Sequence, residues 1–343
     1  MRSIWMMLVL LGLGMGLLQA QSKVATTAAQ FLGIPVGPRA IAMGSAYVAS
    51  HEDVTSIAWN PGSFVQADRS EFLFSNTDWL VGTKFRWAGF MLNIDGENAV
   101  GLSLTQLDYG EEEVTTVSSP EGTGEMWSAN DLAIAVSYSR KLTDRFSIGG
   151  SVKYISQQIW NETASSIGFD LGLLFVTGFN NMRLGMSMQN FGGDMTLDGR
   201  DLLQRVDIDP ADAGSNKTLV GKLKTDSWPI PLLFRVGLAM DVVKTDMLRA
   251  TVAVDALRPN DNQESVNVGA EVGWQEMVFL RGGYKALAGS EPLFNKTNQQ
   301  DGLSFGVGLR YAMEGVGAAH LDYSYSSFGL FGSLNTIAVA ISF

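Results

Sequence analysis

The sequence predicts an all-β fold, an antiparallel transmembrane β-barrel of about fourteen strands. Three observations lead to this class: apolar and polar residues alternate over most of the chain, the connections alternate between short and long, and charge is scarce. Charged residues make up 17% of the 343 residues, against about a quarter in ordinary soluble domains. We therefore expect a barrel whose outer face meets lipid.

The N-terminus carries a short apolar segment. Arg2 precedes the run from Ile4 to Leu18, which is shorter than the about 20 residues of a membrane-spanning helix. The run ends before polar Gln21, so we expect a signal peptide over 1–20, cleaved after Ala20. A retained N-terminal anchor is the alternative, and the absence of Cys excludes a lipid-modified lipoprotein anchor.

Composition excludes several other classes. No later window reaches 18 apolar residues, which argues against a helical membrane protein. The absence of Cys excludes disulfides, thiolate metal sites and thiol nucleophiles. A formal net charge of -11 argues against a nucleic-acid partner, because phosphate binding requires clustered Lys and Arg.

From about residue 70 onward, the dominant pattern has a period of two. In residues 265–274, one side is polar or glycine and the other is apolar. The apolar side consists of Val266, Val268, Ala270, Val272 and Trp274. Such segments are centred near residues 73, 88, 104, 135, 152, 170, 187, 237, 252, 270, 282, 307, 322 and 338.

The lengths of the connections favour an up-and-down barrel. Short links occur at 95–98, 141–145, 177–181, 244–247 and 275–277, and longer ones at 110–128, 192–229, 257–264, 287–301 and 327–332. Bacterial barrels have short turns in the periplasm and long loops outside. A soluble β-sandwich is the alternative, but it has no reason to keep this order.

Aromatic residues fit the same fold. Trp79, Trp127, Trp160 and Trp228 lie where strands meet the proposed outer loops, as an aromatic girdle requires. At the end of the chain, Ile337, Val339, Ile341 and Phe343 share one face of the last strand. A last strand that ends in Phe343 resembles the signal read by the outer-membrane barrel assembly machinery.

The faces opposite the apolar residues carry charges of both signs. We predict that these residues point into the lumen: Lys153, Asp170, Arg183, Arg235, Asp241, Arg249, Asp255, Glu271, Arg281, Lys285, Arg310 and Asp322. Unpaired buried charge is costly, so a network of paired charges is the first interpretation. The alternative is a polar route for a solute, with no single-sign ring to define selectivity.

We expect no enzymatic activity, metal or cofactor. Residues 302–306 match G-x-S-x-G, but Ser304 lies inside an alternating strand and not at a strand-to-helix turn. His320 is expected opposite Arg310, about 20 Å along the strand from Ser304. The acids at 111–113 and Asp207, Asp209 and Asp212 are expected to be solvated loop residues.

Residues 31–64 break the strand pattern and carry a motif of their own, which consists of Gly37, Arg39, Ala40, Met43, Gly44, Ala49, Asp53, Trp59, Asn60 and Pro61. With this motif, the segment resembles the N-terminal segment of the PorV/PorQ family, which is itself similar to FadL-type outer-membrane transporters. Many members continue Asn-Pro-Ala-Gly where this chain has Asn60, Pro61, Gly62 and Ser63.

The resemblance implies a fourteen-stranded barrel in the bacterial outer membrane, with an N-terminal hatch folded into the lumen and both termini periplasmic. We accordingly expect a hatch over 21–68 and a barrel over 69–343; the alternative for the first part is an extended periplasmic arm. The small residues would let the hatch backbone approach the wall, and Asn60-Pro61-Gly62 would turn it.

The resemblance implies two competing functions. The first is type IX protein secretion, in which the barrel accepts secreted proteins and passes them to the surface attachment machinery, with 110–128 and 192–229 as binding loops. The second is passive transport of hydrophobic small molecules, and a third interpretation is a passive scaffold. The expected partners are outer-membrane lipid, the barrel assembly machinery, and either type IX secretion components with secreted proteins or hydrophobic small molecules.

Overall fold

The computed structural model describes residues 25–67, 69–207, 219–287, 302–313, 315 and 317–343. The expected signal peptide and the acids Asp209 and Asp212 lie outside the described residues. Within the described ranges, no helix is both long enough and apolar enough to cross a bilayer.

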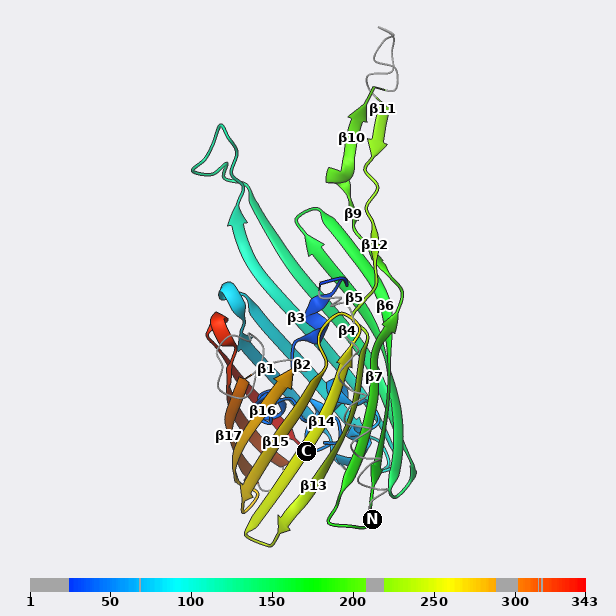
Figure 1. Cartoon of the computed structure of the whole chain (residues 1–343), viewed down its shortest axis with the longest axis vertical. Helices are drawn as coiled ribbons and strands as arrows, with labels where there is room; N and C mark the ends of the chain where they lie inside the picture. The colour runs from blue at the N-terminus through cyan, green and yellow to red at the C-terminus, as the bar shows by residue number, and fades with distance from the viewer. Residues whose placement is uncertain (1–24, 68, 208–218, 288–301, 314, 316) are drawn as a thin grey trace, which may run out of the picture.

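Fourteen antiparallel strands form a closed ring (Figure 1). The strands are β1 (Glu71–Asp78), β2 (Lys84–Asn93), β3 (Asn98–Glu113), β4 (Met126–Thr143), β5 (Phe146–Ile159), β6 (Glu162–Val176), β7 (Arg183–Gly192), β13 (Leu233–Lys244), β14 (Leu248–Pro259), β15 (Ser265–Trp274), β16 (Val278–Leu287), β17 (Gly302–Met313), β18 (Gly317–Ser327) and β19 (Ser333–Ser342). Each pairs with its neighbours in chain order, and β1 pairs with β19 from Glu71↔Ser342 to Asp78↔Asn335. Every predicted strand centre lies in one of these strands, so the predicted fold class is confirmed.

The barrel is apolar outside and polar inside. In β15, Val266, Val268 and Trp274 are exposed, whereas Asn267 and Glu271 are each 1% exposed. A soluble protein buries its apolar face, so this inverted burial requires an apolar solvent around the barrel.

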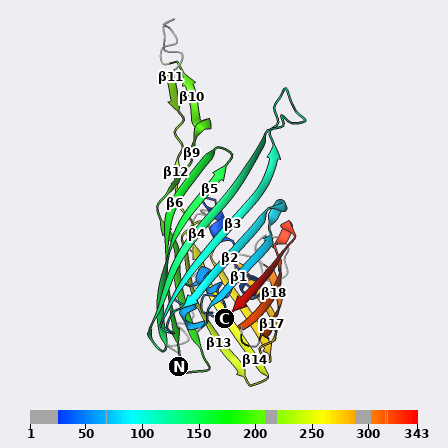
Figure 2. The same cartoon turned by 180° about the vertical axis from the view of Figure 1, so that it is seen from behind.

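The two ends of the barrel differ. Connections 94–97, 144–145, 177–182, 245–247 and 275–277 lie at one end, called here the short-turn end, together with the C-terminus. At the opposite, long-loop end, β3 and β4 rise well beyond their neighbours (Figures 1 and 2). A second projection there contains the hairpin β10 (Leu203–Val206) and β11 (Leu219–Lys222), which stands clear of the barrel above the short strands β8 (Met195–Thr196), β9 (Asp198–Gly199) and β12 (Ser227–Trp228).

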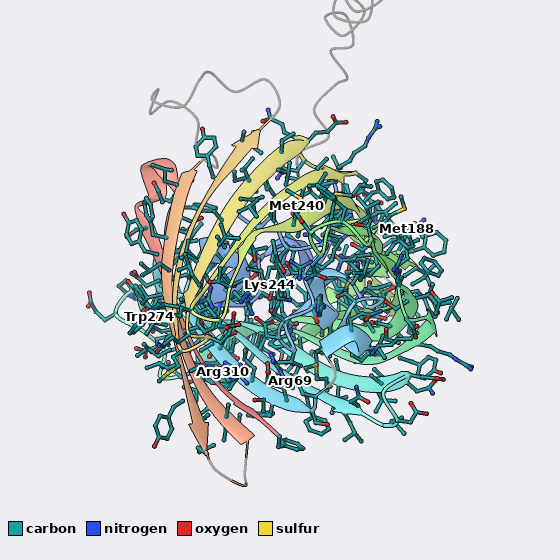
Figure 3. All side chains as sticks on the ribbon, turned by 90° about the horizontal axis from the view of Figure 1, so that it is seen from below. Arg69, Met188, Met240, Lys244, Trp274 and Arg310 are labelled. Atoms are coloured by element: carbon teal, nitrogen blue, oxygen red, sulfur yellow. The ribbon has the colours of Figure 1, made fainter. Side chains whose placement is uncertain are left out.

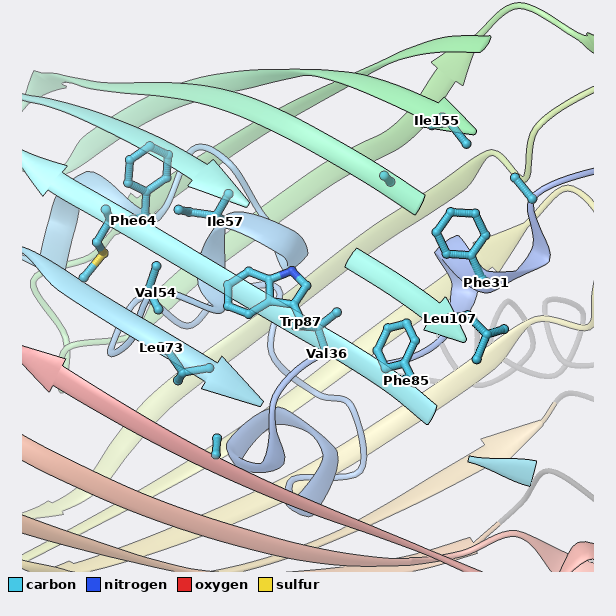
Figure 4. Packing of buried hydrophobic residues seen from close by; sticks show 14 of the residues in the cluster. Phe31, Val36, Val54, Ile57, Phe64, Leu73, Phe85, Trp87, Leu107 and Ile155 are labelled. Atoms are coloured by element: carbon cyan, nitrogen blue, oxygen red, sulfur yellow. The ribbon is translucent and has the colours of Figure 1, made fainter. Parts of the chain in front are cut away.

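Residues 25–67, called here the plug, fold inside the ring. They contain η1 (Gln30–Gly33), α2 (Pro38–Ala42), α3 (Ser56–Trp59) and η2 (Phe64–Ala67). Figure 4 shows their apolar side chains packed against those of the wall. The cluster joins Phe31, Val36, Val54, Ile57 and Phe64 of the plug to Leu73, Phe85, Trp87, Leu107 and Ile155 of the wall. Burying a side chain such as Phe64 stabilises the plug by about 1.5–3 kcal/mol.

Candidate functional site

The first part of the motif contains α2, a one-turn helix that packs against β16, β17 and β18. Gly37 precedes it with φ +83°, in the left-handed region, and Pro38 takes the first helical position, where its missing N–H is no loss. The helix presents Arg39 to the wall, while Ala40 and Ala42 are fully buried.

After this helix the plug backbone lies directly on the wall. A Cβ on Gly44 would lie 2.6 Å from the backbone nitrogen of Tyr284, and one on Gly283 would overlap the Gly44 nitrogen. The hydroxyl of Ser304 accepts the Gly44 N–H at 3.0 Å and donates to the Ala42 carbonyl at 3.1 Å. The small residues of the motif are thus required by close backbone approach.

The second part of the motif is held by Asn60. Its Nδ2 donates to the carbonyls of Val48 and Leu173 at 2.8 and 2.9 Å, and its Oδ1 accepts the Gly62 N–H at 3.0 Å. Trp59 donates its indole N–H to the Val36 carbonyl at 3.0 Å. One amide side chain therefore ties two plug segments to the wall.

An ion-pair cluster on Glu271 joins the plug to three wall strands. The Glu271 carboxylate lies 2.6 Å from Arg39, 3.0 Å from Arg249 and 2.7 Å from Arg281. Arg281 also pairs with Asp322. Because Glu271 is 1% exposed, its negative charge depends on these three guanidinium groups.

Two further carboxylates hold the plug. Glu52 of the plug lies 2.5 Å from Arg183, which also lies 3.4 Å from Asp241. On the wall, Asp255 accepts the backbone N–H groups of Tyr47 and Val48 at 2.6 and 2.8 Å. One carboxyl oxygen that accepts two plug amides is a directional contact between the wall and the plug.

The remaining predicted lumen charges also lie inside the ring, with different partners. Asp170 is 2.7 Å from Lys153, and Arg235 stacks on Trp59 with its guanidinium carbon 4.9 Å from the ring centroid. Arg310 faces the lumen beside His320, its cross-strand partner as predicted, but forms no ion pair within the described chain. Among the other predicted charges, Arg183, Asp255 and Glu271 contact the plug directly, whereas Asp241, Arg249, Arg281 and Asp322 bond other wall residues.

Burial and these contacts shift the pKa values of titratable plug residues. Burial opposes the charge of Glu52, but Arg183 and Arg39 outweigh it and hold the pKa of Glu52 well below its usual range. Burial also opposes the charge of Arg39, yet Glu271 and the neighbouring plug acids raise its pKa. For His51, burial dominates and lowers the pKa to about 4.

The plug separates two cavities of opposite character. At the long-loop end, a cavity of about 830 Å³, called here the vestibule, is lined by residues that include Phe31, Ile34, Leu107 and Leu233. Trp79 and Trp127 line it as well, and Trp79 lies 5.5 Å from Phe328 between ring centroids. These two tryptophans therefore face inward, whereas Trp160 and Trp228 are exposed. The expected girdle position is wrong for the first pair.

At the short-turn end lies a second cavity of about 380 Å³, called here the charged cavity. Figure 3 views this end and shows Arg69, Lys244 and Arg310 within the ring. All three line the cavity, together with Arg39, Arg183 and Glu52. The lumen thus has an apolar compartment, a packed plug and a charged compartment in series.

Several of these residues escaped the sequence analysis. Tyr47, Arg69 and Glu71 were not singled out, although Glu71 is 1% exposed and pairs with Arg69 at 3.0 Å. Glu71 could have been predicted as a lumen residue, because it alternates with the inward-facing residues of its strand. At the other end of the chain, terminal Phe343 is 60% exposed, stacks on Phe90 at 6.4 Å and donates its N–H to the Ser70 carbonyl.

The inverted burial, the closed antiparallel ring and the charged, plugged lumen define an outer-membrane β-barrel. Residues 18–195, just over half of the 343, match the family described as type IX secretion system protein PorV. The chain therefore belongs to the PorV family, as its N-terminal motif predicted. No curated protein sequence matches the chain.

Solved structures show a similar barrel. The CymD monoaromatic hydrocarbon channel is 15% identical with a TM-score of 0.57, covering 90% of this chain and 96% of its own. A Pseudomonas aeruginosa FadL homologue is 15% identical with a TM-score of 0.54, covering 93% and 98%. The Ralstonia pickettii toluene transporter TbuX is 12% identical with a TM-score of 0.52, covering 90% and 97%. At these identities the likeness shows the FadL-like fold.

Proposed function

We propose that this barrel acts in type IX protein secretion, accepting secreted proteins and passing them to surface attachment without catalysing a reaction. Membership of the PorV family supports this role. In this proposal the long-loop end is extracellular, the termini are periplasmic, and residues 21–68 and 69–343 act as hatch and barrel.

The observation that carries the proposal is the β10–β11 hairpin. The hairpin projects beyond the barrel, and its apolar side chains are nevertheless exposed (Figure 1). Leu203, Val206, Leu219 and Val220 are 48%, 40%, 46% and 67% exposed. Exposed apolar residues on a projecting element are typical of a protein-binding surface. The β3–β4 projection adds exposed acids at 111–113.

The plug supports the same role. Ion pairs and buried hydrogen bonds join it to the wall at separate strands: Asn60 bonds Leu173 of β6, and Arg39 pairs with Glu271 of β15. A lumen held shut by such contacts directs the interaction with proteins to the outer projections.

The test is to shorten the hairpin. The Leu223 N–H donates to the Leu202 carbonyl at 2.9 Å, so residues 203–222 can be replaced there by a tight Gly-containing turn. We expect the variant to keep heat-modifiable migration on a gel while secreted proteins accumulate inside the cell. Replacing the four apolar residues by Ser should have the same effect, and Gln204→Ser on the same hairpin serves as the control. Normal secretion in both hairpin variants would refute the role.

The vestibule favours an alternative function, passive transport of hydrophobic small molecules. Its volume of about 830 Å³ lies in the range of small-molecule sites, and apolar residues dominate its lining. If this function holds, toluene should quench the fluorescence of Trp79 and Trp127 saturably, and Leu107→Glu should abolish both quenching and uptake. Gln106→Glu is the matched control, because Gln106 is the neighbour of Leu107 in β3 but is not part of the vestibule lining. Uptake that is unchanged in Leu107→Glu would exclude this route.

Assembly is a separate part of the proposal. We propose that the barrel assembly machinery reads the last strand with its exposed Phe343. Deletion of Phe343 should lower the amount of folded barrel in the membrane, whereas Phe179→Ala, a change at an equally exposed Phe in a short turn, should not.

A further inference from the structure

The charged cavity has more hydrogen-bond donors than its own acceptors use. Its acids are Glu52, Asp53, Glu71, Asp241, Glu276 and Asp322. Each already accepts hydrogen bonds or pairs with a cation, as Asp53 does from the Tyr47 hydroxyl at 2.8 Å and Glu276 with Arg249 at 2.7 Å. The acceptors of the lining are therefore committed to internal partners.

The donors are not. The Nε atoms of Arg39, Arg183 and Arg310 and the Nε2 atom of Gln66 are buried and have no hydrogen-bond partner among the described residues. All four residues line the charged cavity. Arg183 is nearly completely buried, with 2% of its side chain exposed. A buried N–H without an acceptor is costly, so the cavity favours a guest that brings oxygen acceptors.

Two cations of the lining also have no ionic partner in the described parts of the chain. They are Arg310 near the end of β17 and Lys244 at the end of β13. The other cations of the lining, including Arg69, pair with carboxylates. In the view from the short-turn end, Arg69, Lys244 and Arg310 lie inside the ring around its opening (Figure 3). A free guanidinium is suited to bidentate contact with phosphate or carboxylate, and a free ammonium adds a point charge.

We propose that the charged cavity binds a small oxyanion, the phosphate or carboxylate group of a solute that enters from the short-turn end, with Arg310 as its main ligand. A volume of about 380 Å³ admits such a group with a small organic remainder. A cation finds no uncommitted carboxylate in the described lining, and an apolar solute would leave the orphan donors unsatisfied. This site is separate from the vestibule and from the projecting hairpins.

The test is isothermal titration calorimetry on the full-length barrel in detergent, with inorganic phosphate and citrate as separate probes. We expect saturable binding of at least one probe, weakened tenfold or more by Arg310→Gln and less by Lys244→Gln at the opening. Arg258→Gln is the matched control, because Arg258 is an exposed arginine near the long-loop end that pairs with Glu264. Heat-modifiable migration shows that each variant is folded.

The two probes distinguish whether the bound oxyanion is a phosphate or a carboxylate. Binding of phosphate alone or of citrate alone, lost in Arg310→Gln, supports the site and identifies its group. Arg310→Lys keeps the charge without the fork and should bind with intermediate affinity. No saturable binding of either probe, or equal affinity in the wild type and in folded Arg310→Gln, would overturn the proposal.

Discussion

Arg39 Nη2 lies 2.6 Å from Glu271 Oε1, and this pair joins a plug helix to the barrel wall between residues that are far apart in the sequence. Glu271 is the common acceptor of three guanidinium groups, whereas Arg39 is one of its three donors. The two partners therefore do not contribute equally to stability.

Replacing the acceptor should cost more than replacing one donor. In Glu271→Gln, three arginines lose their shared carboxylate, while Arg249 keeps Glu276 and Arg281 keeps Asp322, and we expect destabilisation of about 3–5 kcal/mol, the range for breaking a buried pair. In Arg39→Gln, Glu271 keeps Arg249 and Arg281, so the loss should be smaller. The comparison uses the midpoint of unfolding in guanidinium chloride for each variant, with heat-modifiable migration on a gel as the measure of the folded fraction. Lys84→Gln, at an exposed pair with Asp78, should cost about 0–1 kcal/mol. Equal losses in Glu271→Gln and Arg39→Gln would contradict the shared-acceptor arrangement.

Close backbone contact makes one wall glycine irreplaceable. Gly283→Ala places a methyl group against the plug backbone at Met43 and Gly44. We expect this variant to expose the plug to protease in the folded barrel. The adjacent Gly282→Ala is the control, because its methyl group would meet only Phe305 Cδ1 at 3.8 Å. Equal protease resistance in the two variants would show that the plug does not rest on the wall here.

The Asn60 side chain should be needed to hold the plug in place. Asn60→Ala removes three hydrogen bonds and leaves the carbonyls of Val48 and Leu173 without this donor. A loss of about 1–3 kcal/mol is expected for each buried group left unsatisfied. Hydrogen exchange of the plug amides should accelerate, while the barrel strands stay protected. Asn335→Ala on the outer face should leave exchange unchanged; acceleration in both variants would indicate a non-specific effect.

Acid should loosen the plug through His51. Its pKa is about 4 in the folded protein because of burial, against about 6.5 in an unfolded chain. Between these values only the unfolded plug binds the proton, so stability falls as the pH drops from about 6.5 to about 4 and this loss ends below pH 4. The full effect is on the order of 3 kcal/mol. Protection factors of the plug amides, which are corrected for the pH dependence of intrinsic exchange, should be lower at pH 5 than at pH 7 in the wild type, and this difference should shrink in His51→Gln. The low pKa of Glu52 acts only at more acidic pH, so it does not mimic this window. An unchanged pH dependence in His51→Gln would assign the effect to another group.

The strands could be predicted because each wall side chain contacts one of two environments. Lipid outside and a polar lumen inside impose a period of two that survives in a single sequence, as in residues 265–274. The alternation along a strand also predicts which way a residue at the strand end points, which its place next to a loop does not. Leu73, Ser75 and Thr77 face inward, so Trp79, two residues further, faces inward as well.

The contacts of the plug could not be predicted in the same way. Glu271 was expected in the lumen, but its partner Arg39 comes from an irregular segment without periodicity. Which plug residue meets which strand depends on the closed ring. The β10–β11 hairpin was expected only as a loop, because its strands are four residues long and show no alternation in burial.

The pairing of β1 with β19 sets an order of events in biogenesis. This contact unites the first and the last wall strands, so the ring cannot close until both strands have reached the membrane. The plug precedes β1 directly and fills the space that the closing strands enclose. The seam joins residues of very high sequence separation, so we expect it to form more slowly than the hairpins of neighbouring strands.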